Sequence, residues 1–283
     1  MIFDYSKYIS SVGHKGIVNY KAVDTDAEFF THEAVCPFCK KTITNTVYEQ
    51  IDSSHDEWLY GSFVQSEKVV QCPICGWWEY KYTNQSDAII DGIRANDIIR
   101  HTAVLETYND SDADIPIALL RSYIEKNPDK IYGIDPHKMA ELVRVVFADF
   151  YPDCKVIPFG KTRDGGKDGL LIDANGNHRI IQVKRRSSPD KTEGIAPIRE
   201  LLGVAGLEDY KTGCIFVSTA DHFSADAKRD AQKAVQKNLV DCFDLYDCKA
   251  FVELVNLTRS DHPDVWQDLL RLKQLGTRKT KED

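Results

Sequence analysis

The clearest alternation of apolar and polar positions lies in the second half of the chain. Apolar residues recur at helical spacing after Asp135-Pro136, an N-cap followed by proline: Met139, Leu142, Val143, Val146, Phe147 and Phe150. After Tyr151-Pro152 the period shortens. The pattern then predicts strands at 154–159, 168–174 and 178–184. Asn175-Gly176-Asn177 between the last two is a hairpin signal.

The pattern beyond this hairpin alternates between helices and strands. It predicts helices at 195–209 and 224–237 and after the Asp247 cap, with strands at 213–218 and 240–246. This order of elements indicates an α/β fold, a mixed sheet flanked by helices.

The first half of the chain is less regular. Residues 1–30 have no clear period and form either an arm or an extra strand. An isoleucine stripe predicts a helix over 86–104, and Asp114-Ile115-Pro116 is expected to open a shorter helix that runs to about Glu125. The expected organisation is an arm (1–30), a cysteine-containing ribbon (31–84), a helical connector (85–134), an α/β domain (135–257), and a C-terminal helix with a charged tail (258–283).

Four of the eight cysteines form two Cys-Pro-x-Cys pairs: Cys36, Cys39, Cys72 and Cys75. Two such turns can supply four thiolates to one tetrahedral zinc ion, and the 32 intervening residues fit a hairpin between them. Without a secretory signal a disulfide framework is not expected, so we predict a structural Zn²⁺ ribbon in a cytoplasmic protein. Redox chemistry is the alternative for a single pair.

Within the ribbon, the second cysteine pair is followed by alternating aromatic residues at Trp78, Tyr80 and Tyr82. They favour one packed face of a strand, and stacking on nucleic-acid bases is the alternative. The ribbon therefore has two open roles, binding nucleic acid or docking a protein.

Length and charge limit the remaining classes of protein. The chain of 283 residues has no apolar run long enough for a membrane helix, so no membrane association is expected. The formal net charge of −8 argues against a generic nucleic-acid binder. Residues 155–199, however, hold ten lysines and arginines against five acids. The net charge of the whole chain therefore conceals a basic strip, residues 155–199, whose positive charge is suited to binding a phosphate backbone.

Polar residues converge on the predicted hairpin beside this strip. Gln182 and Lys184 point to one face of their strand, and the hairpin brings Asp168 close to them. Carboxylate and amide oxygens suit Mg²⁺, which contacts substrate phosphates, and a nearby lysine can stabilise developing negative charge. Residue types alone favour an ordinary hairpin that has a turn aspartate and a surface lysine.

The order of motifs resembles the Mrr-like branch of the PD-(D/E)xK nuclease superfamily. The resemblance covers about 136–255 and rests on five ordered motifs: Asp164-Gly165-Gly166-Lys167-Asp168, Gln182-Val183-Lys184, Arg199-Glu200-Leu201-Leu202-Gly203, Val217-Ser218-Thr219 and Phe223-Ser224-x-x-Ala227. It implies a restriction-endonuclease-like fold, with Asp168 and Gln182 as ligands of Mg²⁺ or Mn²⁺ and Lys184 as the catalytic lysine.

One position departs from the family pattern. The first helix of the family carries a glutamate that assists the metal, but here Glu141 falls one residue late, about 100° around the helix. Glu141 is either a fourth site residue or a solvated helix residue.

These observations predict a metal-dependent endonuclease that cleaves double-stranded DNA, for restriction of foreign DNA or phage defence. The candidate DNA contacts are basic: Arg163, Lys167, Arg185, Arg186 and Arg199. Arg199 either faces the cleft or braces its helix. The alternative function is a weak or inactive nucleic-acid sensor or assembly subunit. A homodimer, or a protein partner of the ribbon, is also open.

Overall fold

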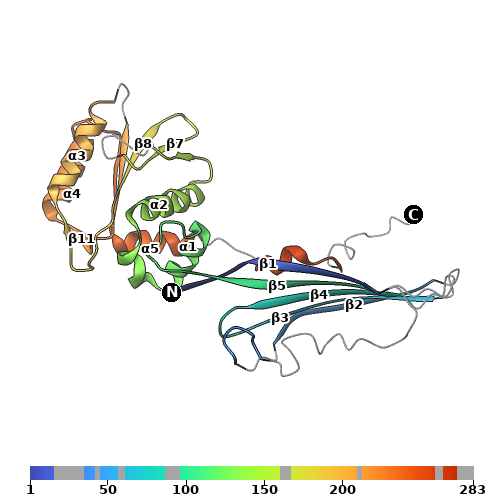
Figure 1. Cartoon of the computed structure of the whole chain (residues 1–283). Coiled ribbons are helices and arrows are strands. Elements are labelled where there is room, and N and C mark those ends of the chain that lie inside the picture. The colour runs from blue at the N-terminus through green and yellow to red at the C-terminus, as the bar shows by residue number, and fades with distance from the viewer. Residues whose placement is uncertain are drawn as a thin grey trace, which may run out of the picture. The chain divides into compact units, whose positions relative to one another are not determined.

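The computed structural model describes residues 1–15, 35–41, 45–56, 61–86, 96–159, 167–208, 212–258 and 264–272. The chain divides into two compact units, each treated by itself below (Figure 1). The α/β unit comprises Met1–Ile2 and Tyr108–Asp261, and the sheet unit comprises Phe3–Thr107 and His262–Asp283.

The α/β unit is built on a five-stranded mixed sheet. Its strand order is β12 (Phe243–Tyr246), β10 (Gly213–Ser218), β8 (His178–Lys184), β7 (Gly169–Ile172) and β6 (Lys155–Ile157). β8, β10 and β12 are parallel, whereas β7 pairs antiparallel with both β8 and β6. The predicted strands and the Asn-Gly hairpin are confirmed.

Helices cover both faces of this sheet, as the α/β prediction required (Figure 1). One face packs against α1 (Ile117–Lys126), α2 (Pro136–Phe150) and α5 (Cys248–Leu257), and the other against α3 (Ile195–Ala205) and α4 (Ala225–Gln236). Short elements complete the unit: the 3₁₀ helix η2 (Pro128–Gly133) and the parallel pair β9 (Thr192–Glu193) and β11 (His222–Phe223).

Local signals explain where these helices begin. The Asp135 carboxylate accepts from the backbone N–H groups of His137 and Lys138, and Pro136 is the first residue of α2. Ser224 and Asp247 cap α4 and α5 in the same way. The expected helix starts are therefore confirmed in this unit.

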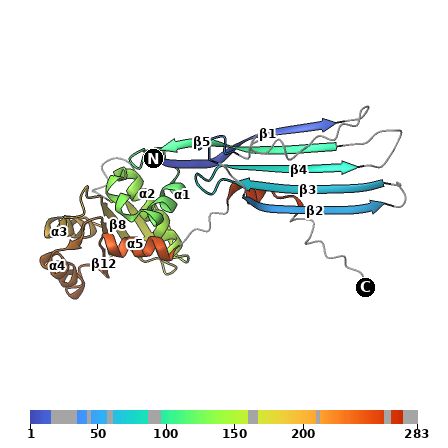
Figure 2. The ribbon, with the colours of Figure 1, turned by 90° about the horizontal axis from the view of Figure 1, so that it is seen from below.

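The sheet unit is one five-stranded sheet, whose strands lie side by side in Figure 2. Its order is β1 (Ile2–Lys15), β5 (Asn96–Tyr108), β4 (Trp78–Ser86), β3 (Gly61–Gln71) and β2 (Thr46–Asp56). β2, β3, β4 and β5 pair antiparallel in sequence order. β1 fulfils the extra-strand alternative for the N-terminus, as far as Lys15.

The helix predicted over 86–104 is wrong from Asn96 onward, where the chain forms β5. Ile98 and Ile99 lie opposite Thr83 and Tyr82 of β4, on alternate faces of the sheet. Adjacent β-branched residues favour a strand, and the sequence pattern did not reveal that a neighbouring strand was available for pairing. Residues 87–95, with the rest of the isoleucine stripe, lie outside the described residues.

The C-terminal segment also differs from the expected helix and tail. Its described part is a 3₁₀ helix, η3 (Val265–Leu269), followed by Leu270–Leu272. Trp266, Leu270 and Leu272 are buried in the core of the sheet unit with Val69 and Tyr80. These apolar side chains make the segment part of the sheet unit, although the sequence around them is charged.

Candidate functional site

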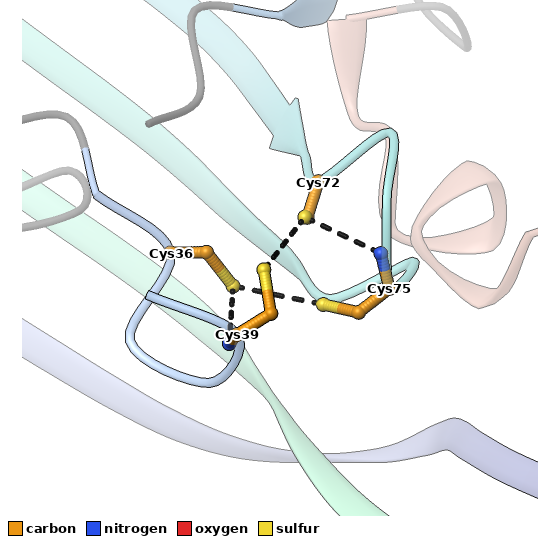
Figure 3. A group of neighbouring side chains, drawn as sticks. All are labelled: Cys36, Cys39, Cys72 and Cys75. Atoms are coloured by element: carbon orange, nitrogen blue, oxygen red, sulfur yellow. Dashed lines mark hydrogen bonds between the residues drawn. The ribbon is translucent and has the colours of Figure 1, made fainter. Parts of the chain in front are cut away.

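The four predicted zinc ligands come together in the sheet unit (Figure 3). Cys36 and Cys39 lie on one turn, and Cys72 and Cys75 lie on a second turn between β3 and β4. All four Sγ atoms lie within 4.8 Å of one another, and two pairs, Cys36–Cys75 and Cys39–Cys72, are 3.6 Å apart. A tetrahedral ion with Zn–S bonds of about 2.3 Å requires sulfur separations of about 3.8 Å, so the cluster fits zinc.

Both cysteine turns have the same local structure. The Cys39 and Cys75 backbone N–H groups point at the Sγ atoms of Cys36 and Cys72, at 3.5 and 3.4 Å. Gly76 has φ +84°, which glycine adopts without strain. Backbone amides directed at sulfur stabilise a thiolate, and a thiolate is the form that binds metal. Burial raises the pKa of the Cys36 thiol to about 12, so metal binding must displace its proton.

The aromatic residues after the second turn pack inside the sheet unit. Trp78 and Tyr80 are 2% and 0% exposed, and the Trp78 indole N–H donates to the Tyr5 carbonyl at 3.0 Å. The packing interpretation is therefore confirmed for these two rings, which are not available to stack on bases.

In the α/β unit, Asp168 lies immediately before β7 and is fixed to β8. Its backbone N–H donates to the Ile181 carbonyl at 2.8 Å, and its Oδ2 accepts from the Val183 N–H at 2.7 Å. The carboxylate is therefore anchored beside the residue that separates Gln182 from Lys184. The predicted convergence of Asp168 with this strand is confirmed.

Gln182 and Lys184 point to the sheet face covered by α3 and α4, the face of Ile180. Gln182 is 4% exposed, and its Oε1 atom has no hydrogen-bond partner among the described residues. A buried amide oxygen without a partner costs about 1–3 kcal/mol, so this atom is suited to a ligand that the protein itself does not supply. Lys184, partly buried, makes no side-chain hydrogen bond or ion pair within the described part of the chain.

Helix α2 contacts this site through a residue that the sequence did not single out. Arg144 Nη1 donates to the Asp168 carbonyl at 2.9 Å. Its stem packs so closely on Gly169 that an added Cβ there would lie 3.3 Å from it. Glu141, one turn earlier, instead binds Lys138 at 2.9 Å and is 37% exposed. The sequence could not reveal this role of Arg144, because its partner is a backbone carbonyl, which every residue has.

The predicted DNA contacts mostly have acidic partners. Lys167 pairs with Glu208, Arg186 with Glu193, and Arg199 with Asp230 of α4. Arg199 thus joins α3 to α4, in agreement with the helix-bracing alternative. Arg185 donates through Nη1 to the Tyr132 carbonyl at 3.0 Å, while its Nε has no partner among the described residues. Arg163 lies outside the described residues.

The Arg186–Glu193 pair belongs to a larger buried cluster. Glu193 is 1% exposed and accepts from Arg186 Nε at 2.9 Å, from Arg186 Nη2 at 2.5 Å and from Ser218 Oγ at 2.6 Å. The glutamate raises the pKa of Arg186 by stabilising its charged form. In the sequence, Glu193 was only one of the five acids of residues 155–199, because its position relative to Arg186 and Ser218 along the chain does not reveal that they are its partners.

The donor set at Asp168 and Gln182 matches what a hard divalent cation prefers. It consists of a carboxylate and a partner-free amide oxygen at the end of β8, with an ammonium group on the same strand. Mg²⁺ uses one or two such protein ligands and completes its shell with water and substrate phosphate. The residues present therefore fit a catalytic Mg²⁺ or Mn²⁺.

Comparison with known proteins gives one family match, which lies in the α/β unit. Residues 131–255, all within the α/β unit, match the Mrr_cat family model, described as restriction endonuclease. No curated protein and no solved structure matches the chain. In the described part of the chain, every helix is too short or too polar to cross a bilayer. Residues 131–255 are therefore similar to the Mrr_cat family of restriction endonucleases.

Proposed function

We propose that this protein is a metal-dependent endonuclease that hydrolyses phosphodiester bonds in double-stranded DNA. The single observation that carries the proposal is the buried, partner-free Oε1 of Gln182 on the strand that holds the Asp168 carboxylate. The match to a restriction endonuclease family supports the reaction class. The role in restriction of foreign DNA, or in phage defence, follows from that family alone.

In the proposed mechanism, Asp168 and Gln182 hold Mg²⁺ or Mn²⁺. The metal, when bound, polarises the scissile phosphate and lowers the pKa of a water molecule. Lys184 carries a positive charge on the same face of β8, where it orients the attacking water or stabilises negative charge on the phosphate. Because Gln182 is neutral, the site has one charge fewer than a pair of carboxylates, so we expect weak Mg²⁺ affinity. Glu141 would join the site only after leaving Lys138.

The proposed phosphate contacts begin with Lys184 and Arg185. Arg185 keeps an unsatisfied Nε, and Lys184 has no acidic partner among the described residues. Lys167 and Arg199 would have to exchange Glu208 and Asp230 for phosphate, which reduces what each adds to affinity. The expected DNA affinity is therefore modest and sensitive to salt.

The cysteine cluster supports a second part of the proposal, a structural Zn²⁺ held by Cys36, Cys39, Cys72 and Cys75. None of the eight cysteines forms a disulfide, which suits a reducing compartment such as the cytoplasm. We propose that the sheet unit docks a protein, either a partner or a second copy of this chain. A dimer would supply one active site for each DNA strand.

The alternative function is a nucleic-acid sensor with an inactive nuclease fold. The observation that favours it is the ion pair of Glu141 with Lys138, which leaves the metal two protein ligands, Asp168 and Gln182. An inactive site, however, has no chemical reason to bury an unsatisfied glutamine oxygen beside an aspartate.

A plasmid-nicking assay separates the two functions. Supercoiled DNA is incubated with the full chain and Mg²⁺ or Mn²⁺, with and without excess EDTA, and conversion to open-circular DNA is measured. We expect metal-dependent nicking that Asp168→Asn and Lys184→Met each reduce at least 100-fold, since each removes a group that acts on the reacting phosphate.

Lys228→Met is the matched control, because Lys228 is exposed on α4, has no part in the proposed site and should not affect cleavage. Circular dichroism should show that all three variants are folded. Nicking by Asp168→Asn or Lys184→Met at the wild-type rate would refute the assignment, and DNA binding without any cleavage would favour the sensor.

A further inference from the structure

The segment that follows Lys184 is held by a buried polar cluster on the adjacent strand and loop. Ser218 of β10 is in register with Lys184 of β8, and the Thr219 N–H donates to the Lys184 carbonyl at 3.1 Å. The Thr219 hydroxyl accepts from the Arg186 N–H at 2.6 Å and donates to the Arg186 carbonyl at 3.0 Å. Lys184 and Arg186 are thus both attached to Thr219, which is fully buried.

The side chain of Arg186 is attached to the same framework through Glu193. Both carboxylate oxygens of Glu193 accept from the Arg186 guanidinium, which makes the pair bidentate. Ser218 donates to the same carboxylate, and the Glu193 carbonyl accepts from the Ser224 N–H at the start of α4, at 2.9 Å. Glu193 is therefore fixed by backbone pairing as well as by its side chain.

Charge and exposure distinguish Arg186 from a typical phosphate contact. Its side chain is 37% exposed, but its guanidinium is already paired with the carboxylate of Glu193, whose side chain is 1% exposed. If Arg186 left Glu193 in order to contact DNA, the Glu193 carboxylate would stay buried without a cationic partner. Leaving such a charge unpaired costs about 3–5 kcal/mol. An arginine in this setting contributes more by holding the chain than by binding phosphate.

The geometry points to Arg186 as a positioning residue: with Glu193, Ser218 and Thr219 it forms a clamp that fixes the carboxyl end of β8, and so Lys184, in the catalytic geometry. This inference rests on the proposed function. It changes the role of Arg186 from a DNA contact to a support of the catalytic lysine. Arg185, one residue before it, remains the phosphate contact.

A conservative substitution tests the clamp. Arg186→Lys keeps the positive charge but cannot form the bidentate pair, so a phosphate contact would largely survive it and a clamp would not. We expect the turnover rate at saturating plasmid to fall about 10- to 100-fold, the range expected when a catalytic group is misplaced by about 1 Å. The KM for plasmid and the DNA affinity measured in EDTA should stay unchanged.

The matched comparison is Arg185→Ala with Arg186→Ala. Arg185→Ala should weaken DNA binding and lower the slope of log affinity against log salt by about 1, as for one lost phosphate contact. Arg186→Ala should leave that slope unchanged while lowering turnover. If Arg186→Ala instead weakens binding and lowers the slope, with normal turnover at saturating DNA, Arg186 is a phosphate contact and the clamp is refuted.

A double-mutant cycle gives a second, independent measurement. Glu193→Gln should lower turnover as Arg186→Lys does, and the double variant should be little worse than either single one, because both remove the same interaction. Additive losses would contradict the clamp. If Glu193→Gln fails to fold, the Arg186 variants still distinguish a clamp from a phosphate contact. A wild-type protein that does not nick would refute the proposed function, whereas a nicking wild type with a fully active Arg186→Lys would refute the clamp alone.

Discussion

At the scale of single residues, the active-site proposal depends on which polar atoms have partners. Asp168 is anchored to the Val183 N–H, whereas Gln182 buries an oxygen that nothing in the described chain satisfies. Buried polar groups are mostly hydrogen-bonded, and the proposal assigns this unsatisfied oxygen to a bound metal ion. The same reasoning separates Arg185, which keeps an unsatisfied nitrogen, from Arg186, which is paired.

The variant Gln182→Glu tests this interpretation. A carboxylate would add negative charge to the metal site, and we expect half-maximal nicking at a Mg²⁺ concentration lower by roughly an order of magnitude. Without metal, the buried charge should lower thermal stability, and Mn²⁺ should restore it. Gln182→Met, which removes the oxygen, is the control and should lose the response to metal. An unchanged Mg²⁺ requirement in Gln182→Glu would contradict a role for this position in metal binding.

At the scale of secondary-structure elements, one carboxylate attaches the C-terminal segment to β3. Glu67 is fully buried and accepts from the Tyr80 hydroxyl at 2.9 Å and from the Leu272 N–H at 3.0 Å, as well as from the Arg271 N–H. Trp266 and Leu270 pack on the same core. The segment is therefore held by hydrogen bonds to a charged group and by apolar burial.

Glu67→Gln should loosen this attachment. The amide cannot match the carboxylate as acceptor for three donors, so we expect a loss of about 2–4 kcal/mol in unfolding free energy. Chemical denaturation measures this loss, and the emission of Trp266 should shift to the red as the segment is released. Glu49→Gln on β2 is the control, because the Glu49 side chain is 52% exposed and its pair with Lys68 contributes little. Equal stabilities of the two variants would show that packing alone holds the segment.

At the scale of the whole molecule, each of the two units has its own core and its own spectroscopic signal. All four tryptophans fall within the residue ranges of the sheet unit: Trp58, Trp77, Trp78 and Trp266. All α-helices in the described residues lie in the α/β unit. Tryptophan fluorescence therefore reports on the sheet unit, and circular dichroism at the helix wavelength reports on the α/β unit.

Removal of the structural metal should affect these two signals differently. A strong chelator should lower the midpoint of the fluorescence transition, since a Cys₄ site contributes about 10–16 kcal/mol of apparent binding free energy to folding. The helical transition should not move. Restoring Zn²⁺ in excess over chelator should reverse the effect, and Cys36→Ser should reproduce it. A chelator that changes neither transition would argue against a structural metal in the sheet unit.

The sequence by itself determined much of the α/β unit. Helix caps, the Asn-Gly hairpin and the change of hydrophobic period are local signals, and the structure confirms the elements they predicted. The two Cys-Pro-x-Cys turns likewise indicated a four-sulfur cluster, because each turn forms within a few residues. Strand alternation and the order of the family motifs made Asp168, Gln182 and Lys184 the candidate site residues.

Only the tertiary structure decided which of these residues are engaged with one another. Ile98 and Ile99 belong to a strand because β4 lies beside them, and pairing with a distant segment overrides a helical pattern. Arg144, Glu193 and Glu67 act through backbone groups or through partners far away in sequence, so no spacing rule reveals them. Charge could be counted along the chain, but whether an arginine meets an acid or a phosphate depends on which side chains the fold brings together.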